Sequence, residues 1–268
     1  MPTRTSLERK KMGKLKKEIF TIEANRELAP SSWLLTLSGD TSAIAGSGQF
    51  VQIALPGKYL RRPISVCDRE GGKLTLLYKV VGAGTDQLSK MKTGECLEIL
   101  TGLGNGFDVS ASGMNVLLVG GGMGVAPLYL LAKELLSAGR KVQVVLGFNK
   151  DSEICLEEEF RALGVAVTIS TADGSRGVKG FVTDAIHTLS EPYDYFYTCG
   201  PMVMMKAVCA LCPTEGQASL EERMGCGFGI CYGCTVATVE GPRRVCADGP
   251  VFTKAQLGWG APQEGGKA

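Results

Sequence analysis

The chain has 268 residues, of which 44% are hydrophobic and 21% are charged, and its formal net charge is +2. This composition is typical of a soluble globular protein, and the length favours two domains plus a small appendage over a single core. A charge so close to neutral gives no support for nucleic-acid or anionic-membrane binding. No stretch reaches the roughly 18 apolar residues that a membrane helix needs, and no secretory signal is visible, so we expect a cytoplasmic protein.

Ten cysteines stand against a single histidine, His187, which we expect on an exposed helix. In a cytoplasmic protein, clustered cysteines indicate metal or redox chemistry rather than disulfides. One histidine excludes a zinc site built on several histidines and leaves acid–base chemistry on a small substrate poorly equipped. Residues 1–16 form a basic extension, interpreted as a solvated leader, and residues 259–268 a Gly-rich tail that we expect to be disordered.

Residues 17–112 are strand-like. β-rich runs at 33–37, 50–55 and 73–81 are separated by clusters of Gly, Pro, Asp and Ser. Short strands at such spacing predict a closed antiparallel Greek-key β-barrel.

Residues 113–215 change to strand–helix alternation, which predicts a Rossmann-like parallel α/β domain. The expected strands are 116–119, 142–146, 165–171 and 195–198, and the expected helices are 128–138, 156–163 and 182–189.

Residues 216–258 lose periodicity and are rich in Cys and Gly, which predicts a small module held by something other than an apolar core. Cys226, Cys231 and Cys234 have C-x4-C-x2-C spacing, and Cys246 follows after eleven residues. This is the spacing of plant-type 2Fe–2S ligation. The intervening glycines allow the backbone to wrap closely, so that amide N–H groups point at the sulfurs.

The alternative for the same four cysteines is a structural zinc site, because thiolates suit both zinc and iron–sulfur clusters. Zinc knuckles usually use paired C-x2-C elements, and here only Cys231 and Cys234 form one. The remaining scattered cysteines are interpreted mostly as small apolar packing residues. They are Cys67, Cys96, Cys155, Cys209 and Cys212.

Two glycine-containing turns follow predicted strands of the α/β domain. Gly120-Gly121-Gly122-Met123-Gly124 opens a helix, and Cys199-Gly200-Pro201 ends a later strand. Glycine lets the backbone approach a pyrophosphate, and a helix N-terminus favours the anion. The first turn lacks the G-x-G-x-x-G spacing, so a standard dehydrogenase is not indicated.

The barrel half carries a second pair of anion-binding signals. Arg62 and Ser65 lie in Arg62-Pro63-Ile64-Ser65, where a guanidinium and a hydroxyl can both contact a diphosphate. Downstream, Gly84-Thr85 begins a predicted helix at 86–91.

These motifs together resemble the ferredoxin–NADP reductase superfamily. The segments 222–234 and 245–252 narrow the resemblance to electron-transfer subunits of dihydroorotate dehydrogenase B, over about residues 17–253. The resemblance implies a cluster on the four cysteines and FAD along the barrel. The implied FAD residues are Arg62, Pro63, Ile64, Ser65, Leu77, Tyr78, Lys79, Gly84 and Thr85.

The nicotinamide cofactor is expected on the two glycine turns, with Cys199 near the nicotinamide ring. NAD is favoured over NADP, because 147–151, after the second strand, contains Lys150 but no arginine, the usual partner of a 2′-phosphate. The expected contacts are Gly120, Gly121, Gly122, Gly124, Cys199, Gly200 and Pro201.

The resemblance further implies an FMN-containing dihydroorotate dehydrogenase catalytic subunit as partner, in a heterotetramer of two of each chain. Electrons would run from FMN through the 2Fe–2S cluster and FAD to NAD⁺, in pyrimidine biosynthesis. Related flavin subunits of transhydrogenases or sulfide dehydrogenases replace a cluster cysteine with aspartate, whereas Cys226 holds that place here. A self-contained NADH-dependent reductase and a zinc-stabilised binding module remain as alternatives.

Overall fold

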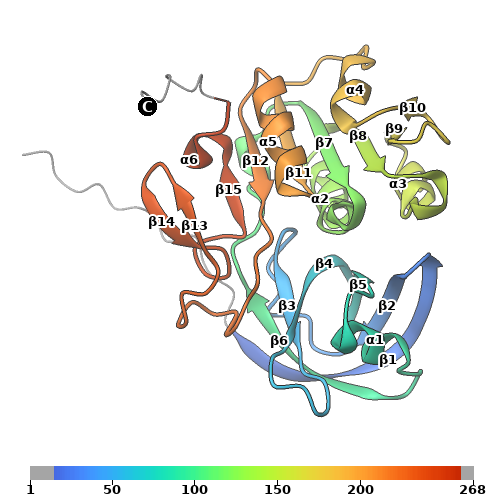
Figure 1. The fold of residues 1–268 in the computed structure, drawn as a ribbon, viewed down its shortest axis with the longest axis vertical. Coiled ribbons are helices and arrows are strands. Elements are labelled where there is room, and N and C mark those ends of the chain that lie inside the picture. The colour runs from blue at the N-terminus through green and yellow to red at the C-terminus, as the bar shows by residue number, and fades with distance from the viewer. Residues whose placement is uncertain (1–14, 261–268) are drawn as a thin grey trace, which may run out of the picture.

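The computed structural model describes residues 15–260, with a barrel below an α/β layer and a small hairpin beside them (Figure 1). The predictions for the basic extension and the Gly-rich tail therefore fall almost entirely outside the described residues. Lys16 already belongs to the first strand, and Trp259 packs against two apolar clusters. In the described part, no helix is long and apolar enough to cross a membrane.

Six strands close into an antiparallel barrel in the order β1-β2-β5-β4-β3-β6, which confirms the predicted Greek-key barrel. Its interior is apolar because alternate residues of each strand point inward, as Leu74, Leu76 and Tyr78 do on β5. Helix α1 (Ala83–Ser89) follows β5. The strands are β1 (Lys16–Ala29), β2 (Ser32–Ser38), β3 (Phe50–Ile53), β4 (Arg62–Glu70), β5 (Lys73–Lys79) and β6 (Cys96–Leu103).

A seven-stranded sheet follows, in the order β10-β9-β8-β7-β11-β12-β15, and all pairs but the last are parallel. The chain adds β8 to β10 on one side of β7 and then crosses to β11 on its other side. The strands are β7 (Asn115–Gly121), β8 (Lys141–Phe148), β9 (Ala166–Thr171), β10 (Val178–Lys179), β11 (Tyr195–Cys199), β12 (Gly216–Ser219) and β15 (Val251–Thr253).

Helices cover both faces of this sheet, as expected of a Rossmann-like domain. Leu118 of β7 faces α2 and α3, whereas its neighbours Leu117 and Val119 face α4 and α5, because successive strand residues point to opposite faces. The helices are α2 (Val125–Ser137), α3 (Glu157–Ala162), α4 (Val182–His187) and α5 (Met202–Leu211). His187 is exposed at the end of α4, as predicted.

Helix α2 joins the barrel to the sheet. The Glu134 carboxylate accepts hydrogen bonds from the Ser47 amide and hydroxyl, at 3.1 and 2.6 Å. One residue earlier, Lys133 donates to the half-buried carboxylate of Asp68 on β4 at 2.9 Å. Leu77 of β5 also belongs to the apolar core around α2. These contacts fix the edge of the sheet over the barrel.

The cysteine module lies between the last two strands of the sheet. Hairpin β13 (Thr235–Thr238) and β14 (Gly241–Arg244) is its only regular structure before β15, and α6 (Lys254–Leu257) ends it. Since β12 and β15 pair within the α/β sheet, the module is an insertion at the sheet's edge. The division at residues 112, 215 and 258 stays our proposal for the domain organisation.

Candidate cofactor sites

The four module cysteines are held in two pairs. Cys226 lies within hydrogen-bonding distance of Cys231, and Cys234 of Cys246. Backbone amides point at the sulfurs, as the glycine content predicted. The Ile230 and Cys231 N–H groups donate to Cys226 Sγ at 3.3 and 3.5 Å, and the Cys246 N–H donates to Cys234 Sγ at 3.4 Å.

This environment favours a thiolate at Cys226. Burial raises the pKa of Cys226, but the N–H groups of Cys231, Phe228 and Ile230 and the adjacent Cys231 thiol outweigh it and lower that pKa to about 6. By contrast, burial raises the pKa of Cys246 to about 12. A bound cation would be needed to ionise the buried pair, and a thiolate is the form that ligates metal.

The paired arrangement fits two metal ions better than one. Structural zinc needs four ligands around one centre. A 2Fe–2S cluster has two irons and four thiolates, so two cysteine pairs suit it. The donor set therefore fits the cluster.

Arg244 ties the loop of the fourth cysteine to the loop of the first two. Its guanidinium makes two parallel bonds of 2.9 Å to the Asp248 carboxylate and a third, of 2.7 Å, to the Gly229 carbonyl. Its charge also lies 5.0 Å from the Tyr232 ring centre. The Asp248 contact fixes the direction of the guanidinium, because bidentate Arg–carboxylate contacts fix orientation as well as distance. The bond to Gly229 then links the two loops.

Gln52 of β3 lies against the cysteine loop. Its side chain is fully buried, and neither of its amide atoms has a hydrogen-bond partner within the chain. A Cβ on Gly227 would lie 2.0 Å from Gln52 Nε2, so only glycine fits there. Gln52 also pairs with Pro63 of β4. A buried amide without partners between the cysteine loop and the proposed flavin strand fits an additional polar group bound there.

The structure brings Arg62 and the start of α1 together, although they are more than twenty residues apart. A Cβ on Gly84 would lie 2.0 Å from Arg62 Nε, so the guanidinium lies across this glycine. The Thr85 hydroxyl is used within the turn, where it accepts from the Val81 N–H at 3.0 Å and donates to the Gly82 carbonyl at 3.1 Å. Arg62 therefore supplies the charge here, and Thr85 shapes the turn.

The first four residues of β4, Arg62 to Ser65, are all partly exposed, in contrast to the buried Val66 and Cys67 that follow. They form an accessible strip where a flat ligand could lie. Lys79 at the end of β5 is exposed as well.

Tyr78 is directed away from this strip. Its ring belongs to the barrel core, and its hydroxyl donates to Asn25 Oδ1 at 3.0 Å. Burial raises its pKa to about 12. Any contact of Tyr78 with a flavin would therefore be made by its backbone.

The two glycine turns of the α/β domain contact each other. A Cβ on Gly124 would lie 2.2 Å from the Cys199 carbonyl oxygen, and one on Gly121 2.3 Å from Met204 Sδ. Gly120 and Cys199 are partners in the β7–β11 register, so both turns leave the same edge of the sheet, where the strand order reverses. Open α/β sheets bind their ligands at this point.

Cys199 is a neutral thiol in this position. Burial raises its pKa to about 12. We therefore expect it to pack beside a ligand rather than to act as a nucleophile.

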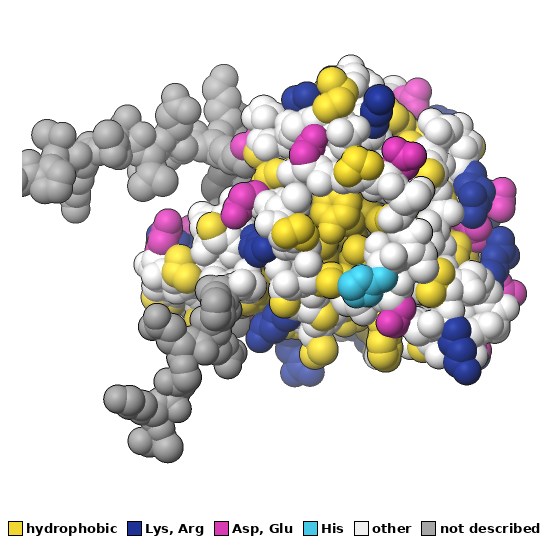
Figure 2. Space-filling view, turned by 90° about the horizontal axis from the view of Figure 1, so that it is seen from above, with side chains coloured by type: hydrophobic (Ala, Val, Ile, Leu, Met, Phe, Trp, Pro, Cys, Tyr) yellow, Lys and Arg dark blue, Asp and Glu magenta, His cyan; other side chains and the backbone are white. Residues whose placement is uncertain are grey.

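A separate hollow of about 410 Å³ lies at the opposite edge of the sheet, between α4 and α5, with His187, Tyr193 and Leu211 in its wall (Figure 2). It is formed by segments that precede β11 and β12. This is the amino edge of the parallel strands, where no glycine turn opens a helix, so it lacks the features of a nucleotide site.

Two site residues were missed by the sequence reasoning. Gln52 and Arg244 take their roles from contacts across the fold. Only Arg244 had a local signal, since it lies two residues before the fourth cysteine and four before Asp248.

Comparison with known proteins agrees with this geometry. Residues 221–258 match the family model of the iron–sulfur cluster binding domain of dihydroorotate dehydrogenase B, and residues 118–210 that of the oxidoreductase NAD-binding domain. The chain is 41% identical to the dihydroorotate dehydrogenase B (NAD(+)) electron transfer subunit of Geobacillus sp. (strain WCH70), over 91% of this chain and 99% of that protein. It is 42% identical to the Bacillus pumilus (strain SAFR-032) subunit of the same name, over 91% and 98%.

Among solved structures, a chain of NADH-dependent reduced ferredoxin-NADP oxidoreductase is similar. It is 32% identical, the superposition covers 90% of each chain, and the TM-score is 0.82.

Proposed function

The chain belongs to the family of dihydroorotate dehydrogenase B electron transfer subunits, and on that premise we propose how its residues carry out the transfer. It is a flavin- and iron–sulfur-dependent NAD oxidoreductase subunit. We propose that it receives electrons at the cysteine module, passes them to the barrel and delivers them to NAD⁺ at the α/β domain. The observation that carries the proposal is the contact of the cysteine loop with β3, next to the accessible strip of β4.

The three cofactors of the subunit are a 2Fe–2S cluster, FAD and NAD. When bound, the cluster supplies one-electron transfer, the flavin both one- and two-electron transfer, and NAD⁺ a hydride acceptor. The chain's own task is to hold these groups close together and in order. Its single histidine, exposed on α4, lies at the other edge of the sheet and takes no part.

For the cluster, Cys226, Cys231, Cys234 and Cys246 are the proposed ligands. The amides at Cys226 Sγ and Cys234 Sγ would stabilise negative charge on the sulfurs. Arg244, oriented by Asp248, links the segment of Cys246 to the loop between Cys226 and Cys231. Because Gly227 has no side chain, this loop can pack directly against Gln52.

For FAD, Arg62 is proposed to bind the diphosphate. Its guanidinium lies across Gly84, where only glycine leaves room for it, and Thr85 shapes the turn. Pro63, Ile64 and Ser65 would line the flavin along the accessible strip. Leu77, Tyr78 and Lys79 would border it from β5, Tyr78 through its backbone alone.

For NAD, the two touching turns are the proposed site. The backbone of Gly120, Gly121, Gly122 and Gly124 at the start of α2 would hold the pyrophosphate. Cys199, Gly200 and Pro201 would border the nicotinamide, with Cys199 as a neutral packing group. Because β5 contacts this turn and Ser32 donates to Met123 Sδ at 3.7 Å, the site faces the barrel.

The partner is proposed to be an FMN-containing dihydroorotate dehydrogenase catalytic subunit, in a heterotetramer of two of each chain. The name "electron transfer subunit" of the relatives implies a catalytic partner. Three apolar side chains stand exposed on the cysteine loop, Phe228, Ile230 and Tyr232, at 42, 73 and 65%. An exposed apolar patch around a redox centre favours a docking face there.

Co-expression tests this proposal. The pair should reduce NAD⁺ with dihydroorotate, and this chain alone should not. Ile230→Glu should prevent the complex, whereas Val239→Glu should not, because Val239 is 66% exposed on the turn of hairpin β13–β14 in the same module. Dihydroorotate-dependent reduction by this chain alone would refute the division of labour.

A second function is favoured by the similarity to NADH-dependent reduced ferredoxin-NADP oxidoreductase. The chain would then serve another NAD(P)H-dependent oxidoreductase. A stable pair with the dihydroorotate subunit that transfers no electrons to NAD⁺ would support this function instead.

A further inference from the structure

The side chain of Gln52 belongs to the barrel but lies against the cysteine module. Residues opposite each other in an antiparallel pair project from the same face of the sheet. Gln52 is opposite Leu100 of β6. Leu100 packs against the apolar core that contains Cys234 and Cys246. A Cβ on Gly227 would lie 2.0 Å from Gln52 Nε2, so the amide also touches the loop that follows the first cysteine.

Both ends of this amide lack a partner. Gln52 is fully buried, and within residues 15–260 neither Nε2 nor Oε1 makes a hydrogen bond. Gln49, three residues earlier and also buried, is fully used: its Nε2 donates to the Gly104 carbonyl at 2.9 Å, and its Oε1 accepts from the Ala45 N–H at 2.6 Å. Buried polar groups are normally paired, so an orphaned amide at a cofactor site indicates a partner that the cofactor supplies.

The cofactor proposed beside Gln52 needs hydrogen-bond donors. A cluster ligated by four thiolates is net negative, and its sulfurs accept N–H groups. The backbone of the module already directs two such donors at Cys226 Sγ, from Ile230 and Cys231. The side-chain amide of Gln52 carries two more N–H groups. Because the adjoining core is apolar, a hydrogen bond from this amide to a negative group would be strengthened.

We infer that the Gln52 side-chain amide donates a hydrogen bond to a sulfur of the 2Fe–2S cluster and thereby raises the reduction potential of the cluster. This inference rests on the proposed cluster ligands. It differs from the backbone contacts at the sulfurs in one respect: the donor comes from the barrel and not from the cysteine module.

The effect on the potential follows from charge. Reduction adds one electron to the cluster, so a donor at a sulfur stabilises the reduced form more than the oxidised form. Gln52 also pairs with Pro63, which lies on the proposed flavin strip. The seating of the cysteine loop on β3 therefore affects the potential of the group from which the flavin takes its electrons.

Gln52→Met tests the hydrogen bond, because methionine keeps an unbranched side chain of similar size and removes the donor. In the chain loaded with cluster and FAD, the ratio of reduced to oxidised cluster at a fixed potential should fall by about three- to tenfold. For a one-electron couple this is a shift of about 30–60 mV to lower potential. A dithionite titration followed by electron paramagnetic resonance measures it.

Leu100→Met is the matched control. Leu100 is opposite Gln52 and packs against the same core, but it has no donor to lose. It should leave the potential of the cluster unchanged, since the substitution alters only apolar packing.

A second measurement needs no variant. When the unmodified chain is made with glutamine labelled by ¹⁵N in the side chain, pulsed electron paramagnetic resonance should show a coupling between this nitrogen and the reduced cluster. Gln52→Met should lose that coupling. If Gln52→Met fails to hold a cluster, the labelled unmodified chain still decides.

The outcomes separate the inference from its premise. An unchanged potential in Gln52→Met, an equal shift in Leu100→Met, or no glutamine coupling in the unmodified chain would overturn the inference and leave the proposed cluster in place. A buried water as the partner of Gln52 would give this result. If metal analysis of the purified chain finds zinc and neither iron nor acid-labile sulfide, the proposed cluster fails and the inference fails with it.

Discussion

Gly227→Ala perturbs the contact between the cysteine loop and the barrel. The stability that it should remove has two sources, backbone strain and overpacking. Gly227 has a φ of +79°, where a side chain costs about 1–2 kcal/mol. The added Cβ would also lie 2.0 Å from Gln52 Nε2 and 2.7 Å from its Cδ. Because Gln52 is fully buried, it cannot swing into solvent. Overpacking of this kind costs about 1–3 kcal/mol.

The sum, about 2–5 kcal/mol of destabilisation, acts on the segment between β12 and β13, which carries three of the four cysteines. We expect the variant to bind less iron and sulfide per chain and to lose its visible iron–sulfur absorption at lower temperature. When Gln52→Ala is added to Gly227→Ala, the overpacking should disappear and only the loss of stability from backbone strain should remain. Iron and acid-labile sulfide analysis, with thermal bleaching of the absorption, measures both effects.

Gly241→Ala is the matched control. Gly241 lies in the same module with a φ of +101°, and nothing stands within 4 Å of its added Cβ. It should lose stability through strain alone and keep a full cluster. The reasoning fails if Gly227→Ala keeps its cluster as well as Gly241→Ala does, or if removing Gln52 gives no recovery.

Three further substitutions test the rest of the site. Arg62→Ala should weaken FAD binding by about tenfold or more, since a charge-assisted contact contributes about 1.5–3 kcal/mol. Arg69→Ala, on the same strand, should retain FAD, and equal FAD retention in both variants would remove Arg62 from the site. Arg244→Gln should speed cluster loss and show no additional effect when combined with Asp248→Asn, because the two side chains form one pair; additive losses would contradict the pairing. Tyr78→Phe removes the hydrogen bond to Asn25, so it should lower the free energy of unfolding by about 1 kcal/mol and leave FAD affinity unchanged. A change in FAD affinity would instead place the Tyr78 hydroxyl at the flavin.

The fold class could be predicted because each half of the chain has a clear periodicity. The apolar run 116–119 and the turn after it needed no tertiary information, and the structure shows β7 there. Boundaries were less certain. Helix α2 begins at Val125, before Pro127, rather than at 128, because proline is tolerated in a helix's first turn. Helix α5 was not predicted, since Met202–Leu211 is apolar on nearly every position and shows no amphipathic pattern.

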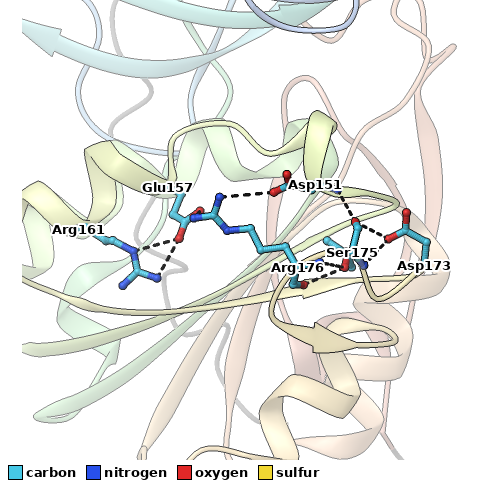
Figure 3. A network of polar contacts seen from close by, with 7 residues as sticks. Asp151, Glu157, Arg161, Asp173, Ser175 and Arg176 are labelled. Atoms are coloured by element: carbon cyan, nitrogen blue, oxygen red, sulfur yellow. Dashed lines mark hydrogen bonds and ion pairs between the residues drawn. The ribbon is translucent and has the colours of Figure 1, made fainter.

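The site was predictable where chemistry and spacing coincide and not where it depends on distant segments. The cysteine spacing pointed directly to the proposed cluster ligands. The ion pair of Arg176 with Asp151 (Figure 3) could not be predicted, because 25 residues separate them and their loops meet only through the β8–β9 pairing. Gln52 has no motif at all, and its position became informative only when the fold buried it without a partner.

A continuous set of contacts connects the cysteine loop to the proposed diphosphate site. Gln52 touches Gly227 and pairs with Pro63, and the preceding Arg62 lies across Gly84 at the start of α1. Each of these contacts is either a strand pairing or a close approach that only glycine permits. Because the interior is tightly packed, a displacement of the loop should be transmitted to β4. Strands β3 and β4, which carry the proposed flavin site, therefore also contact the cysteine loop. Gly227→Ala should therefore alter the visible absorption of bound flavin as well as the cluster, whereas Arg244→Gln, on the far side of the loop, should alter the cluster alone.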